Sequence, residues 1–152
     1  MTRTGTNRRY WLLAVDPRIY HWDTLFVKGK EMFRHAGRKP DALRQIKQMR
    51  RGDRILCYHG KPDHSLYAIA EVTRDPYPDP HHPDAKLQVI DLRAVERLPR
   101  QVSLTELREN RMIRKVKFLK NPRLTISPLT DEEYSEVLRM AGIVASPGIP
   151  LP

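Results

Sequence analysis

Cys57 and His59 have the residue types and the spacing that a thiol nucleophile and its base would need. They lie two residues apart in an apolar run, so a strand at this place puts both side chains on one face. Nucleophilic catalysis also needs a third group that orients the base, and no neighbouring residue is marked for that role. The alternative is a small buried cysteine beside a polar residue at the end of a strand. We favour this alternative and predict no catalytic residue.

The histidines do not have the pattern of a metal site. Zinc takes three or four ligands at defined spacing, usually with more thiols than the single cysteine of this chain supplies. His64 stands alone, and the adjacent His81 and His82 fall in a proline-rich loop, where an exposed turn is expected. The acids of that loop are not paired, and no glycine motif that could cradle a phosphate is present. The sequence therefore predicts no metal, no cofactor and no enzyme.

Positive charge is concentrated in two segments. Residues 28–54 hold ten Lys and Arg against three acids, and residues 108–123 hold seven against one, whereas the whole chain has a net charge of +10. The remainder is therefore slightly acidic. A single basic run is usually a solvated surface, but two such runs favour a polyanionic partner, because phosphate contacts release counterions. We predict nucleic acid as that partner. The candidate phosphate-binding residues are Lys39, Arg44, Lys47, Arg114, Lys115, Lys117 and Arg123.

Aromatic residues of the first half of the chain could stack on a base. Trp11, Trp22, Tyr58, Tyr67 and Tyr77 lie near expected strand ends or loops, and aromatic faces combined with cations are typical of readers of single-stranded or flipped bases. For Trp11 and Tyr67 the alternative of a place in the core is the stronger one. In the basic runs, the guanidinium of Arg38 or Arg123 could grip a phosphate or the edge of a guanine.

The length and composition indicate one domain. A chain of 152 residues can build a real core. No apolar stretch is long enough to cross a bilayer, residues 1–9 lack the apolar core of a signal peptide, and one cysteine excludes an internal disulfide framework. We expect a cytoplasmic protein with a flexible basic leader at 1–9, a domain at 10–143 and a flexible proline-rich tail at 144–152.

The elements that must position these residues are short. Apolar or alternating runs predict strands at 10–15, 55–59, 67–72, 87–95 and 123–127, the last ended by Pro128, with a proline-rich loop at 75–84. Capping boxes predict helices that begin after Ser103 and after Thr130, and near-helical spacing predicts another over 43–49. We expect an α+β fold, a mixed β-barrel of about five to six strands flanked by short helices, because closing the sheet would remove exposed edges.

These motifs, in this order, resemble the EVE domain family, a branch of the PUA-like superfamily that also holds the YTH and ASCH domains. The opening YWLL with Asp16-Pro17 is similar to the family's YWLxKSEP, and GDRILCYH at 52–59 is similar to GDRVLFYHS. VIDLRAVERLPRQVSLTEL at 89–107 resembles VDVRxVxxLPRPVSLxEL, and RLTISPLT at 123–130 resembles RLSVQPVT. The resemblance covers about Tyr10 to Ile143 and implies a PUA-like mixed β-barrel.

The resemblance also implies a reader of modified bases rather than a catalyst, with modified cytosine in DNA as the favoured ligand. Ala14, Val15 and Asp16 stand where the family has Lys-Ser-Glu, Ser127 stands where it has Gln, and only Arg38 and Ala42 match its GVRNYQARN loop. The residues that the aromatic pattern and the resemblance together assign to a base pocket are Trp11, Asp16, Trp22, Arg38, Tyr58, His59, Tyr77 and Ser127.

We therefore predict a non-enzymatic nucleic-acid-binding domain for modified DNA. An RNA-binding PUA-like module is one alternative, and a small-molecule or protein-interaction module with a solubilising basic face is another. We expect a monomer or weak dimer, and no membrane contact.

Overall fold

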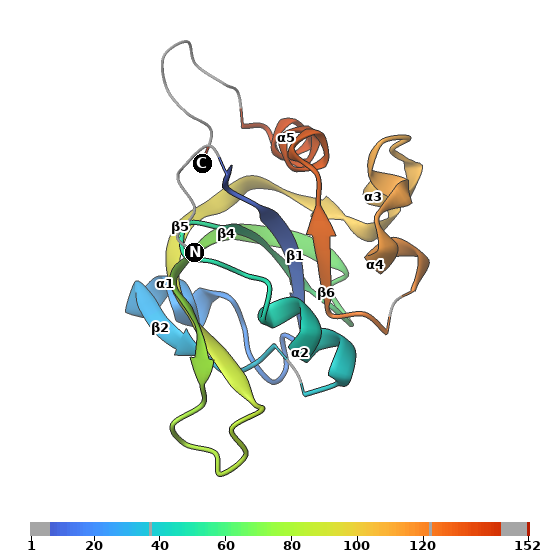
Figure 1. Cartoon of the computed structure of the whole chain (residues 1–152). Coiled ribbons are helices and arrows are strands. Elements are labelled where there is room, and N and C mark those ends of the chain that lie inside the picture. Colours follow the sequence, from blue (N-terminus) through green and yellow to red (C-terminus); the bar gives the residue numbers. More distant parts are fainter. Residues whose placement is uncertain (1–6, 37, 122, 144–151) are drawn as a thin grey trace.

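One mixed six-stranded sheet forms the centre of the computed structural model, which describes residues 7–36, 38–121, 123–143 and 152 (Figure 1). The strands are β1 (Tyr10–Val15), β2 (Lys30–Phe33), β3 (Arg54–His59), β4 (Ser65–Pro78), β5 (Gln88–Ser103) and β6 (Ile126–Leu129). The helices are α1 (Asp23–Lys28), α2 (Pro40–Ile46), α3 (Leu104–Glu109), α4 (Lys117–Lys120) and α5 (Asp131–Met140), with a 3₁₀ turn at Ile113–Lys115. The α+β class is as expected.

The strand order places the ends of β1 and β3 side by side. The sheet runs β2-β5-β4-β3-β1-β6, and β1 pairs with β3 in parallel, with Val15 opposite His59. The other recorded pairings are antiparallel. A parallel pair needs a crossover, and here the crossover carries α1, β2 and α2. The Gly60 amide donates to the Val15 carbonyl at 2.8 Å, so β1 and β3 end at the same edge of the sheet.

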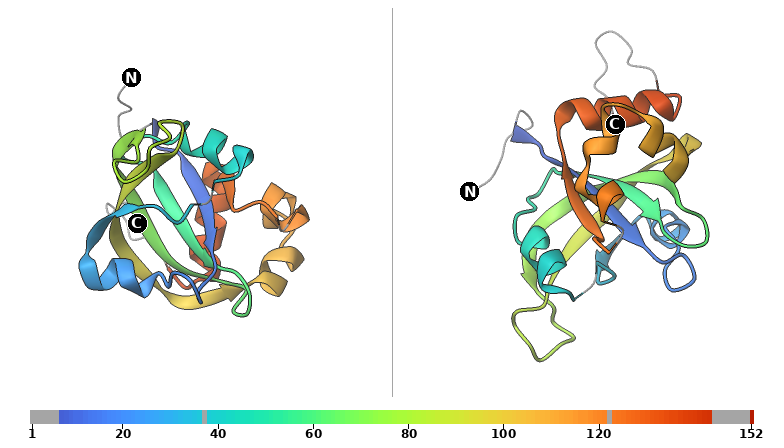
Figure 2. Two further views of the ribbon diagram at one scale, coloured as in Figure 1. Left: turned by 90° about the horizontal axis from the view of Figure 1, so that it is seen from below. Right: turned by 90° about the vertical axis from the view of Figure 1, so that its right-hand side faces the viewer.

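The described strands form an open sheet, whereas the sequence predicted a closed barrel. The sheet is strongly curved (Figure 2), and its register shifts at several points between the long strands β4 and β5. Such shifts bend and twist a sheet. Among the described residues no pairing joins β2 to β6, so these two strands are the edges of an open sheet.

The two faces of the sheet bury separate cores. On β1, Trp11, Leu13 and Val15 point into a first core that also holds Leu25 of α1 and Ile46 of α2. Because side chains alternate along a strand, Leu12 points the opposite way, into a second core under α3, α4 and α5. Tyr58 of β3 belongs to this second core, whereas Cys57 belongs to the first.

Both capping boxes predicted from the sequence are present. The Ser103 hydroxyl accepts from the Glu106 amide at 3.1 Å, and the Glu106 carboxylate accepts from the Ser103 amide at 3.2 Å. Thr130 and Glu133 make the same pair at the start of α5. The predicted strand at 10–15 and the one at 55–59 are confirmed, with β3 beginning one residue earlier.

Other boundaries differ from the prediction. The strand expected at 87–95 continues as β5 to Ser103, and residues 75–78 of the expected loop extend β4. The last strand covers 126–129 and includes Pro128, which we expected to end it. Proline is tolerated there because β6 is an edge strand and needs no second ladder. The expected helix at 43–49 lies at 40–46, and α1, β2 and α4 were not predicted.

The flexible leader and tail predicted at 1–9 and 144–152 fall mostly outside the described residues. Among the described part of the leader, the Arg9 amide donates to Asp53 at 3.1 Å and its carbonyl accepts from Arg54 at 3.0 Å.

Candidate nucleic-acid interface

A pocket of about 520 Å³ opens where β1 and β3 end. One wall is the end of β1, from Ala14 to Asp16, and Tyr58 of β3 lies beside it. The opposite wall comes from Leu104 of α3 and Phe118 of α4. The rest is formed by Gly60, Lys61, His64, Arg108, Leu124 and Thr125. The volume lies in the range of about 300–1,000 Å³ that is usual for sites that enclose a small molecule.

Tyr58 supplies the most buried polar group of the pocket. Its side chain is 1% exposed, and its ring packs edge-on against Phe118, with 4.8 Å between ring centroids. Among the described residues its hydroxyl has no hydrogen-bond partner. Burial raises the pKa of Tyr58 to about 12, while the positive charge of Arg108 acts in the opposite direction. The hydroxyl is therefore neutral at physiological pH and can donate or accept a hydrogen bond.

Backbone hydrogen bonds fix the walls around Tyr58. The Ala14 amide donates to the Thr125 carbonyl at 2.7 Å, which ties the end of β1 to the segment before β6. The Leu104 amide donates to the His64 carbonyl at 2.8 Å, which ties the start of α3 to the turn after β3. Figure 2 shows this turn beside the beginning of α3. The pocket thus has a rigid frame of main-chain contacts.

Asp16 lies at the rim and already has a partner. Its carboxylate accepts from the Arg18 amide at 2.9 Å and from the Arg18 guanidinium at 3.0 and 2.9 Å. These hydrogen bonds lower the pKa of Asp16. A ligand would therefore meet an ion pair here rather than a free carboxylate.

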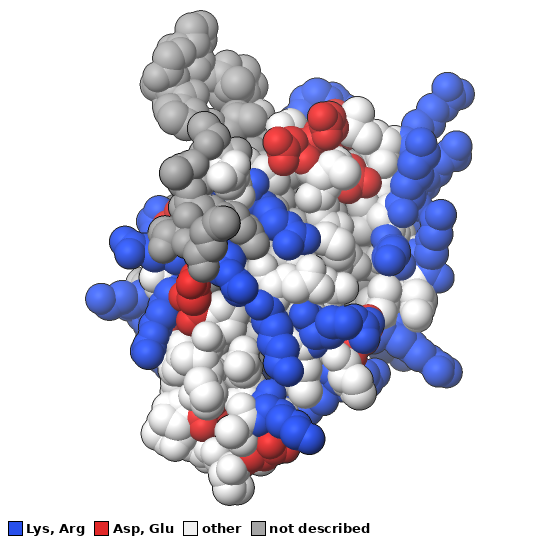
Figure 3. Space-filling view, in the orientation of Figure 1, with Lys and Arg blue, Asp and Glu red and all other residues white. Residues whose placement is uncertain are grey.

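The two basic segments meet beside the pocket. The Thr125 hydroxyl donates to the Ala36 carbonyl at 3.3 Å, which places the segment leading into α2 next to the pocket wall. On the other side, residues 108–123 supply Arg108 at the end of α3 and Phe118 of α4. In the space-filling view, Lys and Arg crowd the side that carries α3 and α4, whereas Asp and Glu gather elsewhere, including over α5 (Figure 3). Basic residues that are far apart in the sequence thus lie on both sides of the pocket.

The cations of residues 108–123 differ from many of the other cations in their pairing. Arg54, Arg93, Arg97 and Arg139 each form an ion pair with a carboxylate, as do several more cations outside residues 108–123. Within the described part of the chain, no ion pair is recorded for any cation of residues 108–123, nor for Lys39 or Lys47. Their charge is therefore available to an external anion.

A second, smaller hollow lies at α2. It has a volume of about 260 Å³, and Arg34, His35 and Arg38 line it together with Asp79. The Arg34 guanidinium donates to Asp79 at 2.7 Å. A shallower groove with Arg44, Lys47 and Lys86 adjoins it through the shared Leu43. Arg38 thus lies in this basic hollow, not in the pocket at β1 and β3.

The structure brings Tyr58 and Asp16 to the pocket but not the two tryptophans. Trp11 and Trp22 are fully buried in the first core, on the other face of the sheet. The indole of Trp11 donates to Asp53 at 3.0 Å, and that of Trp22 donates to the Tyr58 carbonyl at 3.1 Å. Both have a structural role there.

The remaining predicted base-pocket residues are dispersed. His59 is 1% exposed and accepts from the Trp22 amide at 3.0 Å. Tyr77 lies near the far end of β4, where its hydroxyl donates to Asp91 at 2.5 Å and Arg74 lies 3.8 Å above its ring. Ser127 is buried opposite Leu12, without a hydrogen-bond partner for its hydroxyl among the described residues.

The pocket residues that sequence reasoning missed come from separated segments. They are Gly60, Lys61, His64, Leu104, Arg108, Phe118, Leu124 and Thr125. Arg108 was visible only as one member of a basic run. The capping box at Ser103 predicted the helix that carries Leu104 and Arg108, but no pattern indicated which face of that helix meets a cavity.

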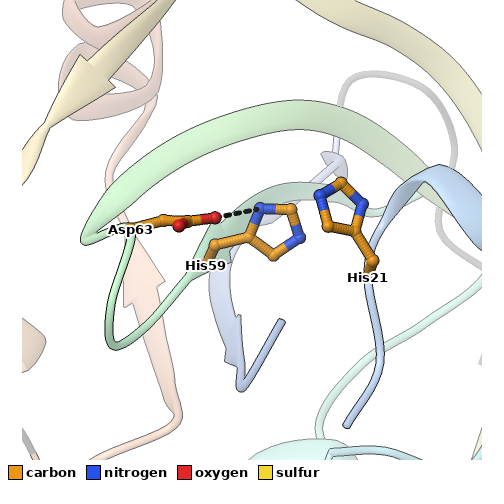
Figure 4. Close-up of side chains that lie close together, drawn as sticks. All are labelled: His21, His59 and Asp63. Carbon is orange, nitrogen blue, oxygen red and sulfur yellow. Dashed lines mark ion pairs between the residues drawn. The ribbon is translucent and has the colours of Figure 1, made fainter. Parts of the chain in front are cut away.

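His21, His59 and Asp63 form a cluster with the composition of a metal site (Figure 4). His59 Nδ1 lies 3.9 Å from the Asp63 carboxylate. However, His59 Nε2 accepts from the Trp22 amide, so the neutral ring carries its proton on Nδ1, the atom a metal would need. Burial, and next the charge of His21, lowers the pKa of His59 to about 4. The cluster fits a neutral histidine that holds the main chain of Trp22 better than it fits a metal ligand.

The geometry also argues against a nucleophile at Cys57. The thiol is fully buried in the first core, and burial raises its pKa well above the usual value. A reactive cysteine needs an accessible thiolate. Among the described helices, none has the length and apolarity to span a membrane.

Comparison with known proteins gives the chain a family context. The model of the EVE domain matches residues 9–140. Protein Atu2648 of Agrobacterium tumefaciens is 32% identical, with a TM-score of 0.84 over 93% of this chain and 99% of that one. Rpa0253 of Rhodopseudomonas palustris is 30% identical, with a TM-score of 0.85 over 93% and 98%.

Human THYN1, solved in complex with DNA containing 5-methylcytosine, shares the fold. It is 19% identical, with a TM-score of 0.75 over 88% of this chain and 97% of that one. A search of curated protein sequences found no significant match.

Proposed function

Because this chain belongs to the EVE domain family, we propose that it is a non-enzymatic nucleic-acid-binding domain that holds one modified base in the pocket at the ends of β1 and β3. A base that leaves its stack can enter such a pocket, lie against apolar and aromatic side chains, and present its edge to polar groups. Phe118 and Leu104 would provide the apolar contact, and Tyr58 a polar one.

One observation carries this proposal. The pocket has a buried hydroxyl without a protein partner among the described residues, and it lies between two segments whose cations largely lack carboxylate partners. A solubilising surface does not need a cavity at its centre. A base reader needs both features, because cations hold the backbone while the pocket selects the base.

The phosphate contacts that we propose lie on both sides of the pocket. Arg114, Lys115, Lys117 and Arg123 would act from the side of α4, and the cations of α2 would act from the other. Lys39 and Lys47 have no recorded ion pair in the described part of the chain, whereas Arg44 is paired with Asp41 and would have to exchange that partner. This division favours Lys39 and Lys47 as the first contacts from α2.

Modified cytosine in DNA is the ligand that we propose. THYN1 in complex with DNA containing 5-methylcytosine supports it through the shared fold. The walls of this pocket support it as well, since Ala14, Leu104 and Leu124 offer apolar surface to a methyl group.

The test is fluorescence anisotropy with short labelled oligonucleotides. The panel holds single- and double-stranded DNA, RNA, and DNA with methylated or hydroxymethylated cytosine, each at two salt concentrations. We expect tighter binding of one modified DNA probe, and this preference should persist at the higher salt concentration. Preference for RNA would reassign the ligand, and uniform binding that disappears with salt would refute the reading pocket.

A further inference from the structure

The hydroxyl of Tyr58 is held in place before any ligand arrives. The edge contact with Phe118 fixes the ring from the second core, and the Trp22 indole fixes the main-chain carbonyl of Tyr58 from the first core. The hydroxyl itself has no hydrogen-bond partner among the described residues. A buried hydroxyl in this state is unfavourable in the free protein, and groups of this kind call for a functional explanation.

The surroundings of this hydroxyl make it selective. Ala14, Leu104, Phe118 and Leu124 line the same pocket and offer no side-chain hydrogen bond, whereas the polar residues Asp16, Lys61, His64 and Thr125 are less buried than Tyr58. A buried polar group discriminates strongly, because a ligand that fails to pair with it leaves two polar groups unsatisfied.

Arg108 adds a polar group that can only donate hydrogen bonds. It lies in the last turn of α3 and lines the pocket, without a recorded ion pair in the described part of the chain. A guanidinium group can only donate hydrogen bonds. Arg108 and Tyr58 line one pocket, so a ligand bound there meets both groups.

We propose that the Tyr58 hydroxyl reads the inward edge of the inserted base and that Arg108 restricts this edge to one with a hydrogen-bond acceptor, such as the carbonyl oxygen of a pyrimidine. The proposal rests on the proposed function and names its specificity-determining residues. Tyr58 is the residue that contacts the base, and Arg108 selects the orientation in which the base binds.

The first experiment removes the hydroxyl alone. Tyr58→Phe keeps the ring against Phe118, and Tyr77→Phe is the matched control, because it deletes the same atom where the hydroxyl bonds to Asp91 at the far end of β4. Binding is measured by anisotropy with a DNA duplex carrying one 5-methylcytosine and with the unmodified duplex. We expect Tyr58→Phe to lose about 3- to 10-fold affinity for the modified duplex, the effect of one hydrogen bond. Tyr77→Phe should bind both duplexes like the wild type.

Thermal unfolding of the free proteins gives a readout that needs no ligand. Tyr58→Phe should unfold at the same temperature as the wild type or higher, because no protein hydrogen bond is lost. Tyr77→Phe should unfold at a lower temperature, because its bond to Asp91 is removed.

The second experiment separates Arg108 from the general basic charge. Arg108→Gln is compared with Arg114→Gln, which removes the same charge from the same segment outside the pocket. Both variants should weaken binding of the unmodified duplex equally. Only Arg108→Gln should reduce the ratio between the affinities for the two duplexes.

The outcomes distinguish the inference from the function on which it rests. If wild-type protein bound the two duplexes equally, the proposed function and this inference would both fall. If the wild type preferred the modified duplex and Tyr58→Phe kept that preference in full, the reader would stand and the role of Tyr58 would be overturned. Equal effects of Arg108→Gln and Arg114→Gln on both duplexes would remove Arg108 from the pocket chemistry.

Discussion

Single buried side chains connect the first core to the strands that carry the pocket. Asp53 is fully buried, and its carboxylate accepts from the Trp11 indole at 3.0 Å and from the amides of Arg9 and Arg50 at 3.1 and 3.0 Å. His59, at the end of β3, accepts from the amide of Trp22. Asp53 directly precedes β3 and His59 is its last residue, so the two side chains anchor the two ends of the strand that carries Tyr58. Their contribution is to stability, and it can be measured without a ligand.

Replacing Asp53 should strongly destabilise the protein. Asp53→Ala leaves one buried and two partly buried donors without their acceptor, and hydrogen bonds to a charged group are stronger than neutral ones, so we expect the free energy of unfolding to fall by about 3 kcal/mol. Urea denaturation followed by tryptophan fluorescence measures this. The exposed Asp84→Ala is the control and should change stability by less than about 0.5 kcal/mol. A loss of similar size in both variants would contradict the role of Asp53.

His59 should make stability depend on pH. Its pKa in the folded protein is lowered from 6.5 to about 4, so the unfolded chain binds the proton more readily. The free energy of unfolding therefore falls as the pH drops from 6.5 towards 4, and the contribution is complete above pH 6.5. The difference in pKa corresponds to about 3 kcal/mol.

The measurement is urea denaturation at several pH values in this range. His59→Gln should remove this part of the pH dependence, whereas the exposed His64→Gln should retain it. An unchanged pH profile for His59→Gln would show that His59 titrates normally in the folded protein.

At the scale of elements, two short helices form one wall of the pocket. α3 has six residues and α4 has four, so neither is stable alone. The capping box of Ser103 and the bond from Leu104 to the His64 carbonyl anchor the start of α3 to the sheet. The pocket wall therefore depends on the cap, because α3 positions Leu104 and Arg108.

Removing the cap of α3 should weaken both folding and base recognition. We expect Ser103→Ala to lower the free energy of unfolding by about 1 kcal/mol, the usual effect of losing a capping side chain. Thr130→Ala removes the equivalent cap of α5 and should cost a similar amount. Only Ser103→Ala should also reduce affinity for the modified duplex, because α5 does not line the pocket. Equal binding by the two variants would show that the pocket wall tolerates a loosened α3.

At the scale of the whole molecule, acids and unpaired cations lie on different parts of the surface. The acids that gather over α5 pair with some of the cations, such as Arg139 with Glu136 at 2.7 Å. The cations of residues 108–123 lie on one side of the pocket, and the unpaired cations near α2 lie on the other. The hydrogen bond from Thr125 to the Ala36 carbonyl connects the two sides. This distribution predicts an electrostatic contribution that both sides share.

Salt dependence should therefore respond to charges from the side of α4. The triple variant with Gln at Arg114, Lys115 and Lys117 should reduce the slope of the logarithm of the binding constant against the logarithm of salt concentration. Each lost phosphate contact lowers that slope by about 0.9 for duplex DNA, so we expect a change of about 2 to 3. Anisotropy titrations at several salt concentrations give the slope. Arg139→Gln removes a cation that is already paired with Glu136 and should leave the slope unchanged. If Arg139→Gln reduced the slope by the same amount, the place of a cation on the surface would not matter for binding.

The sequence alone determined the features that depend on near neighbours. The capping boxes at Ser103 and Thr130 need only four consecutive residues to close, and the runs at 10–15 and 55–59 need only a local apolar pattern. The two basic segments are a matter of counting charges. The motifs along the chain also carried the family resemblance, and with it the expected partner.

Tertiary structure alone decided what depends on the sheet as a whole. Alternation along β1 separates Trp11 from Leu12, but it does not say that α1 and α2 cover one face while the other ends in a cavity. The sequence favours a place in the core for Trp11 but does not distinguish Trp22 from a pocket residue, or Arg108 from any surface arginine. The parallel pairing of β1 with β3 brings Ala14 next to Tyr58. The contact between the turn after β3 and the start of α3 brings Arg108 to the same pocket. These contacts join distant segments, so no local pattern records them.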